Sequence, residues 1–311
     1  MIDVKGLTKE YDSVKAIDNL SFTINKGDIV GFLGPNGAGK TTTMKLLTCF
    51  MPPTSGTASI NGLSIIDDAF AIKTMIGYLP ENNPIYTDMT VIDYLTFIAN
   101  IRKIKDPHPH LKRVIDLCEL GNVINKPIED CSKGFKQRVG LAQSLIHKPD
   151  ILILDEPTVG LDPNQIIEIR HLIKELGKET TILLCSHILS EVSATCSNIF
   201  ILKEGSIIAK GSPQEIQNKG NHKKHIYLDI TASLHDLEEV IQKNKLKIES
   251  IKEMEKKDPF NRYELKSSQD YRAELFKLAV SKKWTLRELK IEESTLEDAF
   301  IELTKQSKCL L

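Results

Sequence analysis

The sequence lacks three features that would assign the chain to a special class of protein. Its 41 Lys and Arg residues are balanced by 42 Asp and Glu residues, and the resulting net charge of −1 argues against a dedicated nucleic-acid binder. The six cysteines form no CxxC pair and no early apolar export segment is present, so we expect a protein of the reducing cytosol. The apolar runs stop far short of the ~20 residues that a membrane-spanning helix requires. What remains is an ordinary globular chain of 311 residues, long enough for about two domains.

The order of apolar runs and helical patterns predicts two folded parts. Over residues 1–218, short apolar runs alternate with helical patterns, which is typical of an α/β domain. The polar segment 219–224 is predicted to be a linker. Residues 225–311 follow the order βαββαβ, which predicts a small α+β module of ferredoxin-like topology. A capping box of Ser294 and Glu297 predicts one last helix after it.

A glycine-rich loop between a strand and a helix is the strongest functional signal. An apolar run at 29–33 predicts a strand, residues 34–42 spell GPNGAGKTT, and a helical pattern follows at 44–47, so GxxxxGK[ST] stands in the context it requires. Glycines let successive N–H groups turn toward phosphate, and the start of the helix adds partial positive charge. Lys40 is predicted to neutralise β- and γ-phosphate oxygens and the Thr41 hydroxyl to bind Mg²⁺. The predicted nucleotide-binding residues of the loop are Gly34, Pro35, Asn36, Gly37, Ala38, Gly39, Lys40, Thr41 and Thr42.

Residues 151–156, with the sequence ILILDE, form an apolar run that ends in two carboxylates. Such a run is typical of a strand buried on both faces of a parallel sheet, and sheets of this kind place ligands at the carboxyl ends of their strands. Adjacent side chains point to opposite sides, so Asp155 can hold Mg²⁺ through a water while Glu156 faces an attacking water. Alone, an acidic pair after a strand is more often a helix cap or a solvated edge. Its pairing with the phosphate loop favours the catalytic interpretation.

Two long stretches give the first domain a family resemblance. GPNGAGKTT at 34–42 and LDEPTVGLDP at 154–163 resemble the Walker A and extended Walker B segments of the ATP-binding subunits of ABC transporters. The resemblance implies a P-loop NTPase fold of the ABC type, an α/β body with an inserted helical subdomain at about 82–148. It also implies that the chain binds ATP and Mg²⁺ and hydrolyses the nucleotide.

The resemblance assigns roles to single residues of the predicted catalytic centre. Asp155 would hold the metal, Glu156 would act as the catalytic base, and Asp162 would lie in the D-loop that crosses between paired subunits. His187, directly after a predicted strand, occupies the place of the family's switch histidine on the γ-phosphate, although a lone histidine there would usually be structural. Lys40, Glu156 and His187 form the predicted catalytic set.

The remaining predicted contacts include two departures from the family pattern. Tyr11 stands where the family has an aromatic residue that stacks on adenine, although a lone tyrosine is more often a packing residue. Glu81 replaces the family's glutamine; its carboxylate can still meet Mg²⁺ or its water, but it adds negative charge beside the phosphates. The family's LSGGQ is spelled CSKGF here, with Ser132 and Gly134 kept and Lys133 in place of a glycine. Ser132 is also predicted to cap the helix that follows.

The resemblance implies partners as well. The chain carries one phosphate loop and one signature peptide, and the family places them on opposite faces of the nucleotide. A complete site therefore needs a head-to-tail homodimer that closes on two ATP molecules, each contacted by Ser132 and Gly134 of the other copy.

The sequence motifs YLPE, SKGFKQR and TLEDAFIELT resemble those of ABC-2 type exporters, including gliding-associated and drug-export ATPases. We therefore expect separate transmembrane permease subunits, a location at the cytoplasmic face of the membrane, and no nucleic-acid partner. The alternative is a soluble ABC ATPase that acts on nucleic acid or ribosomes, but such proteins usually carry two ATPase domains or long insertions between motifs. The C-terminal module either binds a small regulatory ligand or serves in dimerisation.

Overall fold

The computed structural model describes residues 1–219, 224–293 and 295–306. The chain divides into two compact units, Met1–Pro213 and Gln214–Leu311, so the division falls before the predicted boundary at 218. The predicted linker lies largely outside the described residues, with Lys219 the last residue of one helix and Lys224 the first of a strand. Within the described part of the chain, no helix is both long enough and apolar enough to cross a bilayer.

A six-stranded sheet forms the centre of the first unit. Its strands, in spatial order, are β10 (Ser206–Gly211), β9 (Asn198–Lys203), β3 (Ile29–Leu33), β8 (Thr181–Ser186), β7 (Ile151–Asp155) and β6 (Ile76–Leu79). All neighbours pair in parallel except β10, which is antiparallel to β9. Every residue of β7 and β8 is buried, as the apolar runs 151–154 and 182–185 predict for strands covered on both faces. The carboxyl ends of β3, β7 and β8 therefore meet at one edge of the sheet.

Helices cover both faces of this sheet. Helix α1 (Lys40–Leu47) contributes Met44, Leu46 and Leu47 to the core on one face, together with Phe32 of β3. Helices α6 (Pro163–Leu176) and α7 (Leu189–Thr195) contact each other, and α7 packs on β3. Truncating a buried aliphatic side chain of this core to alanine typically costs about 2–5 kcal/mol.

A second sheet, whose neighbouring strands all pair antiparallel, completes the core of the first unit. Its order is β2 (Val14–Ile24), β1 (Ile2–Tyr11), β4 (Ser55–Ile60) and β5 (Leu63–Ser64). Phe22 of β2 lies 5.1 Å from Phe32 and 5.2 Å from Phe200 of the six-stranded sheet, measured between ring centroids. These aromatic contacts join the two sheets.

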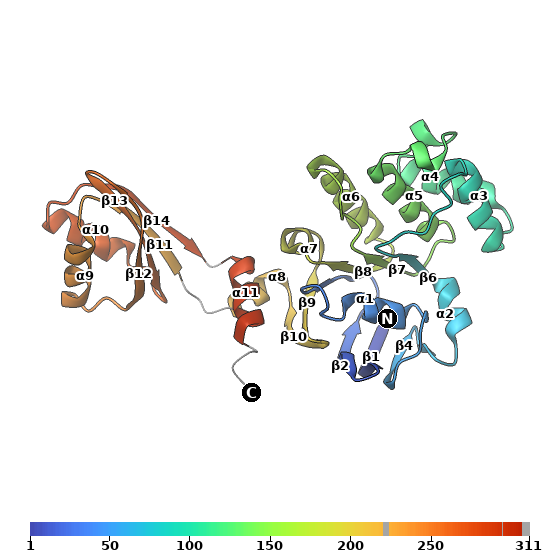
Figure 1. Ribbon diagram of the computed structural model, residues 1–311, viewed down its shortest axis with the longest axis horizontal. Helices are drawn as coiled ribbons and strands as arrows, with labels where there is room; N and C mark the ends of the chain where they lie inside the picture. The colour runs from blue at the N-terminus through green and yellow to red at the C-terminus, as the bar shows by residue number, and fades with distance from the viewer. Residues whose placement is uncertain (220–223, 294, 307–311) are drawn as a thin grey trace. The chain divides into compact units, whose positions relative to one another are not determined.

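Three α-helices and two short 3-10 helices, Gly121–Val123 and Ile128–Asp130, lie between β6 and β7, within the predicted stretch of about 82–148. The α-helices are α3 (Val91–Ile101), α4 (Pro107–Leu117) and α5 (Lys133–Leu145), and they pack on one another (Figure 1). Arg138 of α5 joins the group to α6: its guanidinium donates to Glu119 at 3.0 Å and to Glu168 of α6 at 2.5 Å. Helix α2 (Ala69–Met75) precedes β6.

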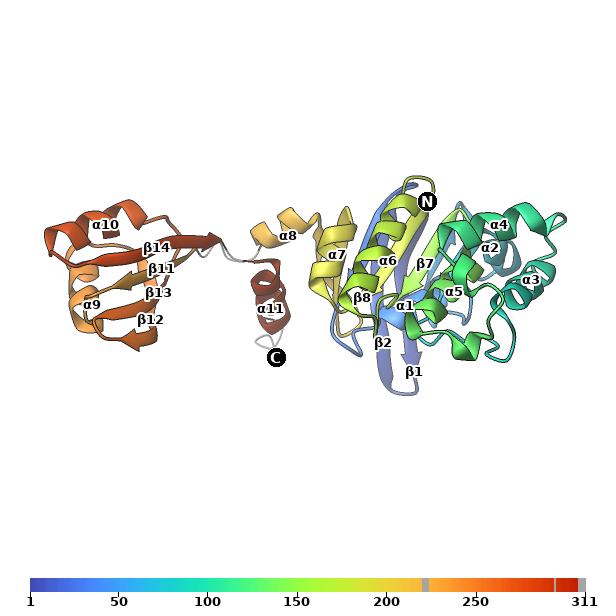
Figure 2. The same cartoon turned by 90° about the horizontal axis from the view of Figure 1, so that it is seen from above.

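The second unit begins one residue into α8 (Pro213–Lys219) and contains a four-stranded antiparallel sheet. Its elements run β11 (Lys224–Ile230), α9 (Leu234–Lys243), β12 (Ile248–Lys257), β13 (Phe260–Ser267), α10 (Arg272–Ser281), β14 (Leu286–Glu293) and α11 (Leu296–Gln306). The spatial order is β12-β13-β11-β14. Helices α9 and α10 share a core with one face of this sheet (Figure 2).

The start of α11 corrects one prediction. Ser294, the expected cap, lies outside the described residues. Thr295 caps the helix instead: its hydroxyl accepts from the Asp298 N–H at 3.2 Å, and its own N–H donates to the Asp298 carboxylate at 2.9 Å. The partner of the cap is therefore Asp298 and not Glu297, because the cap lies one residue later than expected.

Candidate active site

The glycine-rich loop joins β3 to α1, as the sequence predicts. Helix α1 begins at Lys40, directly after Gly39, which has a φ of 100°. A Cβ atom at Gly39 would lie 2.6 Å from the Ala16 carbonyl oxygen, and one at Gly34 would lie 2.5 Å from that of Leu202. Only glycine fits such positions, so the backbone itself lines the turn ahead of the helix.

Lys40 is held inside this loop. Its ammonium group donates to the Gly34 carbonyl at 2.8 Å and to the Pro35 carbonyl at 3.3 Å, and it lies 3.8 Å from Glu156 Oε1. Only 6% of the lysine surface is exposed. The cation is thus fixed at the start of α1, where the helix dipole already favours an anion.

Asp155, the last residue of β7, is fully buried. Neither of its carboxylate oxygens has a hydrogen-bond partner among the residues described. Burial, together with the charges of Glu156 and Glu81, raises the pKa of Asp155 to about 6. The Thr41 hydroxyl lies close enough to lower this pKa, although it makes no hydrogen bond within ordinary limits of distance and angle.

These groups fit a magnesium ion. A buried carboxylate without a partner beside a hydroxyl is a set of hard oxygen donors, the kind that Mg²⁺ prefers. The described residues contain no cluster of three His, Cys, Asp or Glu side chains that could hold a metal. A magnesium site needs no such cluster, because one or two carboxylates usually share the ion with water and substrate phosphates.

Glu156 lies between the phosphate loop and His187. Its Oε2 is 2.8 Å from His187 Nδ1, and its Oε1 faces the Lys40 ammonium. The glutamate is 5% exposed, whereas nearly half of the histidine side chain is open to solvent. Glu156 has a φ of 52°, a left-handed conformation that costs a non-glycine residue about 1–3 kcal/mol, while its N–H donates to the Cys185 carbonyl at 3.0 Å. The carboxylate is therefore aimed by the turn that follows β7.

A cavity of about 420 Å³ gathers most of the predicted residues. It is lined by Ala16, Asn36, Gly37, Ala38, Gly39, Lys40, Thr41, Thr42, Glu81, Glu156, Val159 and His187. Ala16 and Val159 were not predicted, since small apolar side chains carry no chemical signal in a sequence. The cavity thus combines backbone N–H groups, one cation, two carboxylates and one imidazole, a set suited to a polyphosphate.

Six predicted nucleotide contacts and the predicted metal ligand Asp155 do not line this cavity, and four of these contacts lie on segments outside the phosphate loop. Tyr11 ends β1, is 44% exposed, and places its hydroxyl 2.9 Å from Met51 Sδ. Ser132 caps α5, as predicted, by accepting from the Phe135 N–H at 3.3 Å. Gly134 follows it in the same turn of α5. Asp162 caps α6 and accepts from two backbone N–H groups at 3.0 Å.

The signature peptide, residues 131–135, packs on the predicted D-loop segment, residues 160–162, and on the first turn of α6 in the same chain. A Cβ atom at Gly160 would lie 1.9 Å from Lys133 Nζ, and one at Gly134 would lie 2.6 Å from the Gln165 side chain. The lysine that replaces the family's glycine therefore lies across Gly160, whose φ is 73°. Gly34 and Pro35 also stay outside the lining of the cavity and face Lys40 with their carbonyl groups.

Comparison with known proteins identifies the family to which the chain is similar. The family model described as ABC transporter matches residues 17–159. The bacitracin transport ATP-binding protein BcrA of Bacillus licheniformis is 35% identical over 97% of this chain and 97% of its own length. The Nod factor export ATP-binding protein I of Ralstonia nicotianae is 34% identical over 70% of this chain and 68% of its own. A solved structure of an ATP binding subunit of an ABC transporter matches with a TM-score of 0.64 and 29% identity, covering 70% of this chain and 92% of that one. The chain therefore belongs to the family of ABC transporter ATP-binding proteins and is an ATPase built on the P-loop fold.

Proposed function

We propose that this chain hydrolyses ATP as a head-to-tail homodimer and thereby drives export through separate permease subunits. One observation carries the dimer: the cavity holds the phosphate loop, Glu156 and His187, but neither Ser132 nor Gly134 of the same chain lines it. Ser132, which caps the N-terminus of α5, is exposed, so this helix start is the part of the signature peptide that would face the phosphates bound to another copy. Export is supported by the spellings shared with ABC-2 type exporters and by the relatives named for bacitracin transport and Nod factor export.

The chain's own residues supply most of the chemistry. Lys40 exchanges its two carbonyl partners for β- and γ-phosphate oxygens and neutralises their charge. Glu156, already aimed by its turn, accepts the proton of the attacking water, and His187 orients its carboxylate and contacts the γ-phosphate. Asp155, Thr41 and Glu81 would hold Mg²⁺, which supplies charge neutralisation to the transferring phosphoryl group.

Tyr11 and Asp162 keep the roles that the resemblance implies. The exposed ring of Tyr11 at the end of β1 is available for stacking on adenine. Asp162 ends the D-loop segment against which the signature peptide packs. We therefore place Asp162 and the signature peptide on the surface that the second copy covers.

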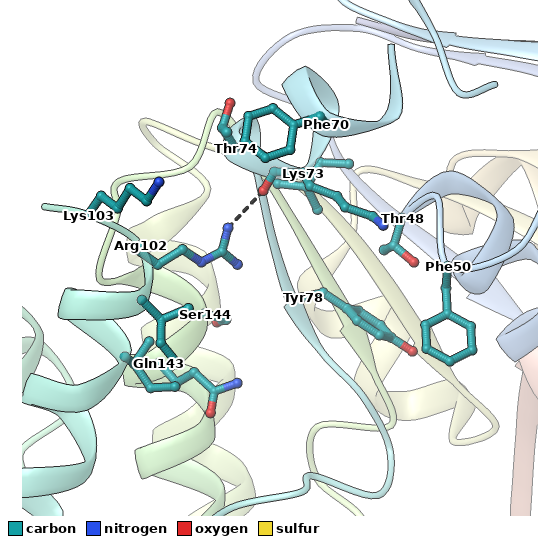
Figure 3. A pocket seen from close by; sticks show the side chains of 13 residues that line it. Thr48, Phe50, Phe70, Lys73, Thr74, Tyr78, Arg102, Lys103, Gln143 and Ser144 are labelled. Carbon is teal, nitrogen blue, oxygen red and sulfur yellow. Dashed lines mark hydrogen bonds between the residues drawn. The ribbon is translucent and has the colours of Figure 1, made fainter. Parts of the chain in front are cut away.

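A groove beside α3 fits the permease. This α2–α3 groove has a volume of about 590 Å³ and lies between α2 and β6 on one side and α3 and α5 on the other (Figure 3). Its aromatic lining residues are Phe50, Phe70 and Tyr78, and its cations are Lys73, Arg102 and Lys103. Phe50 and Phe70 are 71% and 84% exposed, and no carboxylate lines the groove. We propose that a segment of the permease with apolar and acidic side chains docks here, which would place the chain at the cytoplasmic face of the membrane.

The inserted helices and the C-terminal sheet each match a known type of structural module. The helices α3 to α5 correspond to the helical subdomain that the ABC type inserts between β6 and the signature peptide. The order βαββαβ with the sheet order β12-β13-β11-β14 supports a ferredoxin-like module at the C-terminal end of the described chain. The soluble nucleic-acid or ribosome ATPase is disfavoured, because the named relatives are transport and export proteins.

The proposal is tested by the Glu156→Gln variant of the full chain. The amide keeps the shape of the side chain but cannot accept the proton of water, so the variant should bind ATP with Mg²⁺, accumulate as a dimer in size-exclusion chromatography with light scattering, and lose turnover. Turnover at the wild-type rate would remove Glu156 from the role of base.

A further inference from the structure

A buried carboxylate outside the cavity joins the two turns that carry Glu156 and His187. Glu191 lies on α7 and is 3% exposed. Its Oε2 accepts hydrogen bonds from Thr158 Oγ1 at 2.6 Å and from Ser186 Oγ at 3.2 Å. Its Oε1 is buried and has no hydrogen-bond partner in the part of the chain that the structure describes.

Each hydroxyl belongs to one of the two turns. Thr158 lies in the turn after β7, two residues beyond the glutamate of the site. Ser186 ends β8 directly ahead of His187, and its oxygen also accepts from the Ile188 N–H at 3.0 Å, so it fixes the chain on both sides of the histidine. Because both hydroxyls converge on one oxygen of Glu191, that oxygen sets the separation of the two turns.

Packing alone does not account for Glu191. Burying a carboxylate is unfavourable unless its oxygens are hydrogen-bonded, and here one oxygen has no partner among the described residues. The next residue, Val192, is fully buried against Gly31 of β3, so apolar contacts already fix this end of α7 on the sheet. An apolar side chain at 191 would avoid the cost of the buried carboxylate.

We propose that Glu191 is a positioning residue for ATP hydrolysis. By accepting from Thr158 and Ser186, it holds the two turns at the separation that brings the Glu156 carboxylate to 2.8 Å from the His187 ring. It acts through the geometry of one acceptor oxygen and not through its charge, since both donors use that same oxygen. The inference rests on the proposed roles of Glu156 and His187.

The test compares variants of the full chain in steady-state ATPase assays and in Mg-ATP binding measurements. Glu191→Ala should lower kcat about 100-fold with an unchanged Kd, because the turns lose their fixed separation. Glu191→Gln keeps one acceptor oxygen and should restore most of kcat. Thr158→Val and Ser186→Ala should each lower kcat partly, and Thr158→Val should not add to the loss of Glu191→Ala, because it removes the same link. Val192→Ala, the matched control on α7, should lower the melting temperature and leave kcat unchanged.

Three results would overturn the proposal: wild-type kcat in Glu191→Ala, a Glu191→Gln variant as slow as Glu191→Ala, or an equal loss of kcat in Val192→Ala. If Glu191→Ala does not fold, the two hydroxyl variants decide, and wild-type kcat in both counts against the link. Failure of the underlying function is a separate outcome, because it would appear as wild-type turnover in Glu156→Gln.

Discussion

Glu156 Oε2 lies 2.8 Å from His187 Nδ1, although the two residues directly follow different strands and are 31 positions apart in the chain. The contact exists because β7 and β8 are parallel neighbours whose carboxyl ends meet at one edge of the sheet. The opposite oxygen of the same glutamate faces Lys40 at 3.8 Å, so one carboxylate connects the phosphate loop with the histidine.

His187→Ala should lower kcat about 100-fold and change the Kd for Mg-ATP little, because the histidine orients the base and does not hold the nucleotide's other phosphates. His171→Ala removes an exposed histidine of α6 and should leave both constants as in the wild type. Steady-state kinetics on the purified variants measures kcat, and equilibrium binding measures the Kd for Mg-ATP. A rise in Kd without a fall in kcat would mean that His187 only binds the nucleotide.

Lys40→Ala should raise the Kd for Mg-ATP about 10- to 100-fold, since a buried cation that can donate to phosphate is removed. Lys26→Ala, in an exposed turn, is the control for loss of one positive charge. Isothermal titration calorimetry gives both affinities. Equal affinity in the two variants would contradict the assignment of the phosphate loop.

The pKa of Asp155 predicts how stability depends on pH without Mg²⁺ and nucleotide. Burial raises this pKa from 3.8 to about 6, so the folded state binds the proton more tightly than the unfolded state. Stability from this group is present below about pH 4 and is lost as the pH rises to about 6, by on the order of 2–3 kcal/mol.

Asp155→Asn cannot ionise and avoids that loss. At pH 7.5 without Mg²⁺, it should therefore melt at a higher temperature than the wild type, and the difference should shrink toward zero at pH 4. Asp150→Asn, an exposed position just before the same strand, should melt as the wild type does. If Asp155→Asn melts no higher than the wild type at pH 7.5, the charged carboxylate of Asp155 does not destabilise the folded state.

If the permease docks in the α2–α3 groove, changes in this groove should weaken membrane association without changing ATP turnover. Phe70→Ala combined with Lys73→Glu removes one aromatic contact and reverses one charge of the groove, so it should lower the fraction of the chain that sediments with native membranes. The basal ATPase rate of the purified protein should stay unchanged, because neither residue lines the nucleotide cavity. Ile167→Ala, at another exposed apolar position, is the control. Undiminished association with membranes would place the permease contact elsewhere.

The sequence predicted those parts of the site that local chemistry determines. The loop 34–42 must follow a strand and open a helix, because its glycines and Lys40 make sense only in that context. The run ending in Asp155 and Glu156 was predictable for a similar reason, since unbroken apolar residues need cover on both faces.

Contacts that depend on tertiary packing were not predictable. Ala16 lines the cavity only because β2 passes the start of α1, and nothing in its chemistry signals this position. Glu191 resembles any glutamate in the first turn of a helix until the burial of α7 makes it a shared acceptor. The cap of α11 was placed one residue early because Ser294 with Glu297 and Thr295 with Asp298 satisfy the same pattern.

A complementation assay tests most directly that two copies share each site. Lys40→Ala disables the phosphate loop of one chain, and Gly134→Asp introduces a carboxylate at the start of α5 of another, where it would repel the γ-phosphate. Each variant alone should be inactive. A mixture of the two should recover ATPase activity, because in the mixed dimer one site combines an intact loop with an intact signature peptide. A mixture as inactive as its components, under conditions in which the two variants form a dimer, would contradict the shared site.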